Sequence, residues 1–259
     1  MPRLLNEKII SNVKIAPDIF KMVIKSEYIS EKSKPGQFIN IKCSKGIETV
    51  LRRPISICSV DRSEGTFEIV YQIRGKGTEI LSLLTEGDYL DFIGPIGNCF
   101  DIDNSENRIA VVGGGIGIFP LLYVLEESRS SVKKAFIGFR NREAVILEDE
   151  FSKNSSQLYI STDDGSYGYK GFVTDLLTES LEKKEIDIIY TCGPVPMMKK
   201  VAAAAEKYGI KCQLSMEERM GCGIGACLVC VCKVRYGDDW EYSHVCSDGP
   251  VFWSDKIIL

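Results

Sequence analysis

The feature that most constrains the fold of this chain is a change of rhythm near residue 105. Before it, short β-like runs such as QFINIKC and TFEIVYQIR are separated by Gly, Pro, Asp and Ser, at lengths typical of an antiparallel barrel or sandwich. After it, strand-like runs alternate with helical ones, which predicts parallel crossover units and a doubly wound sheet. The chain therefore combines two architectures.

We expect an α+β protein of several domains. An antiparallel β-barrel should occupy residues 1–102, with GTEILSLLTEG as its one helix, because its apolar residues fit an amphipathic helix better than a strand. A doubly wound α/β domain should follow at 103–211. Residues 212–259 contain too few apolar side chains for a core of their own, which indicates a small module stapled by a ligand.

Composition excludes several functions. The net charge of -4, with Lys and Arg scattered along the chain, provides no basic surface for nucleic acid. The N-terminus lacks the apolar core of a signal peptide, and no run is long enough to span a membrane. We expect a cytoplasmic protein without membrane insertion, and in a reducing compartment clustered cysteines indicate a metal or redox site more often than disulfides.

A glycine-rich stretch, AVVGGGIGIFPLLYVL, joins the first strand of the α/β domain to its first helix. Glycines there let backbone N–H groups approach a diphosphate at a helix N-terminus. The spacing differs from the G-x-G-x-x-G fingerprint, and no acidic residue follows the next strand, KKAFIGFR, so a turn built only for tight packing is the alternative. The candidate nucleotide-binding residues are Gly113, Gly114, Gly115 and Gly117.

A second contribution to the same cleft comes from IDIIYTCGPVPMM, which places Cys192 and Gly193 at the end of a later strand. Doubly wound sheets bind ligands at the carboxyl ends of their strands, so this pair should face the nucleotide. A lone cysteine is more often buried packing than chemistry.

The barrel carries two anion-friendly features of its own. LRRPISICS places Arg53 and Ser56 on an otherwise apolar strand, and Arg suits bidentate recognition of phosphate. RGKGTEILSLL places Gly77 and Thr78 at a helix N-terminus. Together they suggest a ligand with a diphosphate, although an exposed Arg pair at a strand end remains the alternative.

Five cysteines lie in MEERMGCGIGACLVCVCKVRYGDDWEYSHVC. The spacing C-x4-C-x2-C followed by a distant Cys is that of plant-type 2Fe-2S ligation. A zinc ribbon would prefer two C-x2-C knuckles, a 4Fe-4S site C-x2-C-x2-C, and a Rieske centre two histidines, whereas the chain has one, His244. The candidate iron ligands are Cys222, Cys227, Cys230 and Cys246, with Cys232 either structural or an alternative ligand.

These motifs in this order resemble the ferredoxin-reductase flavoprotein superfamily: R-P-x-S in a barrel, G-K-G-T opening a helix, then GGGIGIFPL and CGPVPMM in an α/β domain. With MEERMGCGIGACLVC appended, the resemblance narrows to the electron-transfer subunits of B-type dihydroorotate dehydrogenase and covers essentially the whole chain.

The resemblance implies FAD on the barrel, a nicotinamide nucleotide on the α/β domain and the 2Fe-2S cluster on the C-terminal module. It implies NAD rather than NADP, although Arg140 could meet a 2′-phosphate. It also implies that the glycines at 113–117 and the Cys192–Gly193 pair face the nicotinamide nucleotide. The residues that it places against FAD are Arg53, Pro54, Ile55, Ser56, Val70, Tyr71, Gln72, Gly77 and Thr78.

The implied function is electron transfer from an FMN-containing dihydroorotate dehydrogenase catalytic subunit, through 2Fe-2S and FAD, to NAD⁺ in pyrimidine biosynthesis. The two subunits would form a heterotetramer of two plus two, and this chain would carry no site for an organic substrate. One alternative keeps the cofactors in a reductase subunit of a hydrogenase, sulfide or ferredoxin-linked complex. Another is a zinc-stapled binding module without redox activity.

Overall fold

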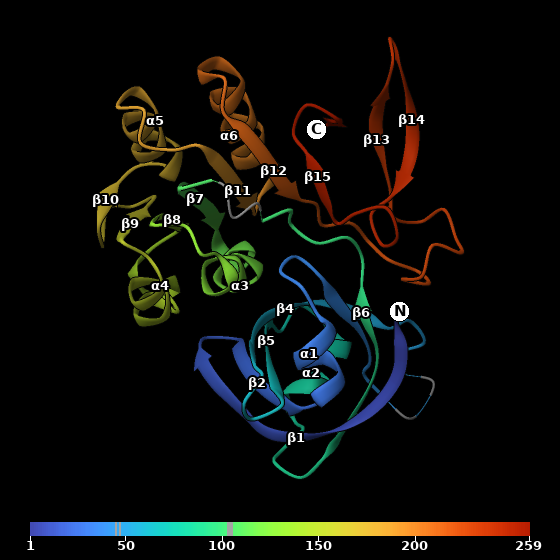
Figure 1. The fold of residues 1–259 in the computed structure, drawn as a ribbon. Helices are drawn as coiled ribbons and strands as arrows, with labels where there is room; N and C mark the ends of the chain where they lie inside the picture. Colours follow the sequence, from blue (N-terminus) through green and yellow to red (C-terminus); the bar gives the residue numbers. More distant parts are fainter. Residues whose placement is uncertain (45, 47, 103–105) are drawn as a thin grey trace.

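The computed structural model describes residues 1–44, 46, 48–102 and 106–259. It consists of a barrel, a helix-covered sheet and a smaller C-terminal sheet (Figure 1). The domain boundary expected between residues 102 and 103 meets residues 103–105, which lie outside the described residues.

The N-terminal part is a closed barrel of antiparallel strands in the order β1-β2-β5-β4-β3-β6. In β5, Phe67, Ile69 and Tyr71 point into the barrel core, as the two-residue period of a strand requires. The strands are β1 (Arg3–Ala16), β2 (Ile19–Lys25), β3 (Phe38–Lys42), β4 (Arg53–Asp61), β5 (Thr66–Gln72) and β6 (Tyr89–Ile96).

Two short helices accompany the barrel. The expected one is α2 (Lys76–Ser82). A second, α1 (Glu27–Lys32), is an addition to the expected elements, and the Ser26 hydroxyl caps it by accepting from the Ile29 N–H. With only six residues, α1 is too short to produce a helical period in the sequence.

The α/β domain is doubly wound, as the sequence predicts. Its sheet has the order β10-β9-β8-β7-β11-β12-β15, and helices α3 and α4 cover one face while α5 and α6 cover the other (Figure 1). Its elements are β7 (Arg108–Gly114), η1 (Gly115–Ile118), α3 (Phe119–Glu127), β8 (Val132–Phe139), η2 (Arg142–Ala144), α4 (Glu148–Asn154), β9 (Gln157–Thr162), β10 (Tyr169–Lys170), α5 (Val173–Glu182), β11 (Ile188–Cys192), α6 (Val195–Tyr208) and β12 (Lys211–Ser215).

The C-terminal part is bound to this sheet by a strand of its own. The chain forms a hairpin of β13 (Val231–Tyr236) and β14 (Asp239–His244), returns through β15 (Val251–Trp253) along β12, and ends in β16 (Ile257–Ile258). The boundary that we place between 211 and 212 falls inside β12, which pairs in parallel with β11. The reason is that β12 is the last parallel strand of the nucleotide sheet.

The core of the C-terminal part is shared with its neighbours. Val245, Cys230 and Cys246 pack with Phe38 of the barrel and with Leu214 of β12 in one buried cluster. This sharing accords with the scarcity of apolar residues in the last segment.

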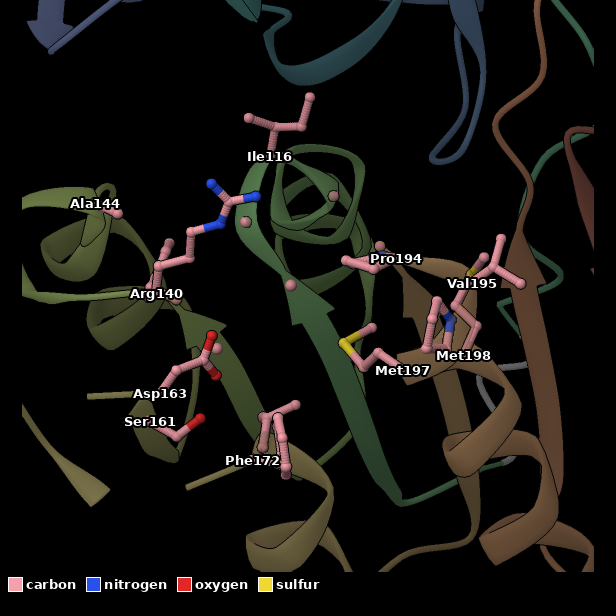
Figure 2. A pocket seen from close by; sticks show the side chains of 18 of the residues that line it. Ile116, Arg140, Ala144, Ser161, Asp163, Phe172, Pro194, Val195, Met197 and Met198 are labelled. Carbon is pink, nitrogen blue, oxygen red and sulfur yellow. The ribbon is translucent and has the colours of Figure 1, made fainter. Parts of the chain in front are cut away.

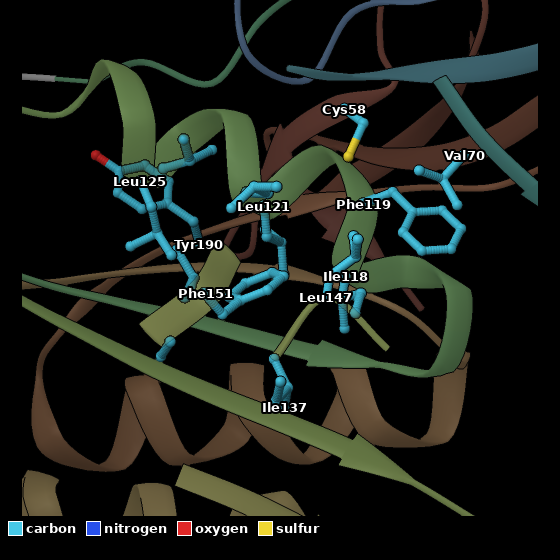
Figure 3. Packing of buried hydrophobic residues seen from close by; sticks show 14 of the residues in the cluster. Cys58, Val70, Ile118, Phe119, Leu121, Leu125, Ile137, Leu147, Phe151 and Tyr190 are labelled. Carbon is cyan, nitrogen blue, oxygen red and sulfur yellow. The ribbon is translucent and has the colours of Figure 1, made fainter. Parts of the chain in front are cut away.

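The barrel and the α/β domain meet along α3. Cys58 and Val70 of the barrel lie in one buried cluster with Phe119 and Leu121 of α3 (Figure 3). No helix among residues 1–44, 46, 48–102 and 106–259 is long and apolar enough to cross a membrane.

Two adjacent carboxylates at the end of α3 contact the barrel. The Ser59 hydroxyl donates to Glu126 Oε2 (2.7 Å), and the Arg62 guanidinium donates to both carboxylate oxygens of Glu127 (2.6 and 3.1 Å). Burial raises the pKa of Glu126 from 4.5 to about 7, although the Ser59 hydrogen bond opposes the rise.

We predict that Glu126→Gln stabilises the isolated chain at pH 8 by about 2 kcal/mol and has little effect at pH 4.5. A carboxyl with a raised folded-state pKa favours folding fully below pH 4.5, and this contribution is lost as pH rises through about 7. An amide keeps the Ser59 contact without a charge. Denaturant unfolding of wild-type protein, Glu126→Gln and Glu127→Gln across this range measures the effect, and a pH-independent difference between Glu126→Gln and wild type would contradict the prediction.

Candidate functional site

The barrel opens between two of its strands where the flavin-binding residues are expected. The β4–β5 ladder runs from Asp61↔Thr66 only as far as Ile57↔Ile69. Beyond it, residues 53–56 of β4 pair with β3, and residues 70–72 of β5 pair with β2. Residues 53–56 and 70–72 therefore face each other without hydrogen bonds of a β-ladder between them. Their free backbone N–H and C=O groups can form hydrogen bonds with the edge of a planar ring such as a flavin.

Alternation along β5 divides the three expected flavin contacts. The Tyr71 side chain lies inside the barrel core, where it stacks on Phe20 (5.9 Å between centroids) and donates to Asn12 Oδ1 (3.1 Å). Burial raises the pKa of the Tyr71 hydroxyl to about 12. Val70 packs in the interdomain core, and Gln72 lines a cavity. Because the Tyr71 side chain points into the barrel, Tyr71 can contact a ligand in the opening only through its backbone.

Arg53 and the first turn of α2 lie against each other. A Cβ added to Gly77 would be 3.0 Å from Arg53 Nε. Thr78 Oγ1 accepts from the Arg74 N–H (2.8 Å) and donates to the Gly75 carbonyl (3.1 Å), which fixes this turn. A guanidinium beside open helix N–H groups suits a diphosphate.

A second cavity, of about 570 Å³, adjoins Arg53. Residues 51–54 of the barrel line one side of it, and residues 217–220 line the other. The MEERM segment that precedes the cysteine loop therefore lies beside the expected FAD strand.

A larger cavity, of about 960 Å³, lies at the carboxyl ends of the parallel strands and reaches the barrel (Figure 2). Gly114, Gly115, Gly117 and Gly193 line it, as expected for a nucleotide site. Other parts of its lining come from Gln72 and Arg74 of the barrel.

Gly113 and Cys192 are not among the residues that line this cavity. A Cβ on Gly113 would be 2.8 Å from Ile118 Cγ2, so this glycine serves the close packing of β7 against the following turn. Burial raises the pKa of the Cys192 thiol to about 12, which keeps it protonated and unreactive.

The two loops that are expected to bind the nucleotide touch each other at Gly117. A Cβ on Gly117 would be 2.5 Å from Gly193 Cα and 2.6 Å from the Cys192 carbonyl oxygen. Both neighbours are backbone atoms, so the loops can approach this closely only with glycine at 117.

Sequence reasoning missed Asp163, which follows β9 and lines the cavity near Arg140 (Figure 2). An acidic residue at this edge can accept from a ribose hydroxyl, whereas Arg140 can meet a phosphate. The sequence prediction places such an acid only after β8. The signal that could have found Asp163 is STDDG, which begins with the last two residues of β9, the strand beside β8 in the same sheet.

The cysteine loop directs backbone N–H groups at sulfur. Cys222 Sγ accepts from the N–H groups of Ile224 (3.4 Å) and Ala226 (3.3 Å). Cys246 Sγ accepts from Gly225 N–H (3.1 Å). Inward-facing N–H groups stabilise the negative charge of an iron–sulfur cluster.

The four expected ligands form two neighbouring pairs. Burial raises the pKa of Cys222, but the N–H groups around it and a hydrogen bond with the Cys227 thiol outweigh this and lower it to about 6. Burial raises the pKa of Cys246 to about 12, and a hydrogen bond with the Cys230 thiol adds to the rise.

Within the described part of the chain, no three His, Cys, Asp or Glu side chains form a group able to hold a metal ion. Cysteines arranged as two pairs rather than around one point fit a cluster in which each of two irons takes two protein ligands.

Cys232 and His244 are engaged elsewhere. Cys232 packs in the C-terminal core and donates to the Ser243 carbonyl (3.6 Å), so its thiol turns toward β14. The His244 ring lies 3.5 Å from Asp248 Oδ2. Neither arrangement brings these side chains to the N–H groups of the loop.

Comparisons with family models match each part of the chain. Residues 6–100 match the oxidoreductase FAD-binding domain, residues 111–203 the oxidoreductase NAD-binding domain, and residues 217–258 the iron–sulfur cluster binding domain of dihydroorotate dehydrogenase B.

Curated relatives cover nearly the whole chain. The dihydroorotate dehydrogenase B (NAD⁺) electron transfer subunit of Fusobacterium nucleatum is 42% identical over 95% of both chains. That of Caldanaerobacter subterraneus is 40% identical over 98% of both.

Solved structures show the same fold. A chain of an NADH-dependent reduced ferredoxin-NADP oxidoreductase has a TM-score of 0.85 at 34% identity, over 97% of this chain and 89% of that one. The cytochrome b5 reductase domain of Ulva prolifera nitrate reductase, at 19% identity, has a TM-score of 0.65 over 80% of this chain and 94% of that one.

We predict that Gly117→Ala weakens NADH binding by at least about tenfold, because the added methyl must separate two backbone loops. The rate of flavin reduction as a function of NADH concentration, followed by stopped-flow absorbance of the purified chain, gives the apparent dissociation constant and measures the change. Flavin content is the internal control, since the barrel is untouched. Wild-type affinity for NADH would contradict the close approach at Gly117.

We predict that Cys230→Ser abolishes the iron–sulfur absorption, whereas Cys232→Ser retains it, because only Cys230 belongs to the loop pairs. Iron per chain and the visible spectrum of the two variants form a matched comparison. Loss of iron in Cys232→Ser together with retention in Cys230→Ser would reverse the assignment.

Proposed function

Because this chain belongs to the family of dihydroorotate dehydrogenase B electron transfer subunits, we propose that it passes electrons from a dihydroorotate-oxidising subunit to NAD⁺. It is an oxidoreductase subunit with FAD, NAD and 2Fe-2S domains. Its pathway is pyrimidine biosynthesis. The barrel would hold FAD, the α/β domain NAD⁺ and the cysteine loop the 2Fe-2S cluster, and these groups would supply the redox chemistry between the partner subunit and NAD⁺.

The observation that carries this proposal is the order of the three sites. The nucleotide cavity reaches the barrel opening through Gln72, and Glu217 lines both this cavity and the smaller one beside Arg53. The segment that begins at Glu217 continues directly into the cysteine loop. The flavin site thus lies between the nicotinamide and the cluster. When bound, the flavin supplies the conversion between two-electron and one-electron transfer.

The chain's own residues bind and orient. Arg53 and the first turn of α2 hold the diphosphate of FAD, and the edges at 53–56 and 70–72 hold its ring. Gly114, Gly115 and Gly117 admit the diphosphate of the nucleotide, and Asp163 accepts from its ribose. The cysteine loop binds the cluster through Cys222, Cys227, Cys230 and Cys246 and shields it with backbone N–H groups.

The partner is a dihydroorotate dehydrogenase catalytic subunit that carries FMN, and the complex contains two copies of each chain. Apolar side chains exposed on the cysteine loop support protein docking there: Ile224, Leu228 and Val229 are 56%, 76% and 55% exposed. A partner seated on this loop would bring its flavin toward the cluster.

A second candidate partner is a ferredoxin-linked complex. The observation in its favour is the 34% identity to a chain of a ferredoxin-NADP oxidoreductase over 97% of this chain. The identity of 42% to a dihydroorotate dehydrogenase B subunit favours the first partner.

We predict that the chain, coexpressed with the dihydroorotate-oxidising subunit of its own organism, purifies as a coloured complex that oxidises dihydroorotate with NAD⁺. Absorption spectra should show flavin bands on a broad iron–sulfur background. A complex that carries both cofactors but leaves dihydroorotate unoxidised would exclude this partner. A colourless zinc protein would exclude every redox function.

A further inference from the structure

One barrel side chain, Asn40, reaches the cysteine loop. Asn40 lies at the middle of β3 and is 1% exposed. Its Nδ2 donates to the Cys222 carbonyl oxygen (3.2 Å), across 182 positions of sequence. An expected iron ligand of the cluster loop is thus tied to the barrel by a buried amide.

The loop is built to accept this side chain. Gly223, next to Cys222, has φ +71, and a Cβ there would be only 2.2 Å from Asn40 Nδ2. The loop backbone at Gly223 therefore contacts the Asn40 amide directly. A side chain at 223 would clash with this amide, and the positive φ favours glycine.

The polar nature of Asn40 is costly to the barrel. Asn40 Oδ1 is buried without a hydrogen-bond partner among the described residues. An apolar residue at 40 would avoid this unsatisfied acceptor. Folding alone does not account for asparagine here, but the donor that it offers to the Cys222 carbonyl does.

Asn40 also adjoins the expected flavin strand. In the β3–β4 ladder it pairs with Pro54, which lies in the stretch that faces the barrel opening. Its carbonyl accepts from Arg52 Nη1 (3.3 Å). Asn40 therefore connects β4, through its ladder pairing with Pro54, to Cys222, through its side-chain hydrogen bond.

We propose that Asn40 is a positioning residue that fixes the Cys222 end of the cluster loop against the barrel, and so sets the reduction potential of the cluster and the rate of its exchange with the flavin. This inference rests on the proposed function. The Cys222 sulfur receives two backbone N–H bonds, and their lengths depend on where the Cys222 backbone is held. Hydrogen bonds to cluster sulfurs raise the potential, because they stabilise the more negative reduced state.

The test compares Asn40→Leu with Asn98→Leu in the purified full-length chain. Leucine has nearly the shape of asparagine but cannot donate. Asn98 is a matched control, because its Nδ2 also donates from the barrel to a C-terminal carbonyl, that of Asp248 (2.6 Å), but from an exposed position.

In Asn40→Leu we expect NADH to bleach the flavin at the wild-type rate, while cluster reduction slows about 10- to 100-fold in stopped-flow absorbance. The cluster midpoint potential should fall, and the EPR spectrum of the reduced cluster should change. Asn98→Leu should match wild type in all three. If leucine prevents cluster incorporation, Asn40→Ala replaces it, with the same readouts expected.

The role of Asn40 would be overturned if its variant kept the wild-type cluster potential, EPR spectrum and cluster reduction rate. It would also be overturned if Asn98→Leu changed these three properties as much as Asn40→Leu does. Failure of the proposed function looks different, because the wild-type chain itself would then lack flavin or cluster, or fail to pass electrons between them.

Discussion

The packing of α3 on the barrel determines the geometry of the site. The helix follows directly on the glycine turn of the nucleotide cavity, and its first residue, Phe119, packs with Val70 beside the barrel opening. Its last residues, Glu126 and Glu127, bind Ser59 and Arg62 on β4 and the turn after it. One short helix thus sets the separation of the two cofactor sites, and a shift of α3 would move the nucleotide away from the flavin opening.

The position of the cluster depends on a different kind of contact. The C-terminal part contributes one strand to the nucleotide sheet and shares its core with Phe38 of β3 and Leu214 of β12. Cys230 and Cys246 are held in this shared core, whereas Cys222 lies outside it. The Asn40 amide ties the loop to the barrel at the backbone of Cys222, an expected iron ligand, and Asn40 pairs with Pro54 of the expected flavin strand.

Local sequence was informative where one short stretch carries the chemistry. The glycines after β7 and the cysteine spacing are single motifs, and in the structure Gly114 and Gly117 line the nucleotide cavity while N–H groups of the cysteine loop point at Cys222 and Cys246. The two-residue period of β5 predicts that the Tyr71 side chain points into the barrel. The family resemblance assigns residues 70–72 together to the flavin and does not distinguish backbone from side-chain contacts. The packing role of Gly113 depends on Ile118 and could not be seen without the turn.

Long-range contacts were beyond sequence reasoning. The pairing of β12 with β15, the placement of Asp163 beside Arg140 and the Asn40–Cys222 bond join segments whose registers no local pattern specifies. In FINIK, Asn40 reads only as the outward residue between two core isoleucines. Its significance arises because the outer face of β3 is covered by the returning C-terminal chain.

Backbone hydrogen bonds to sulfur distinguish Cys222 and Cys246 from the bystander thiols. Burial raises the pKa of Cys43 and Cys232 to about 11 and that of Cys212 to about 12, which keeps these sulfurs as neutral packing groups. At Cys222 the surrounding backbone N–H groups and the Cys227 thiol together outweigh burial and lower the pKa to about 6. Iron binds the thiolate, so the N–H groups that the loop turns toward Cys222 and Cys246 favour the charged form that an iron ligand needs, even at Cys246, where burial raises the pKa to about 12.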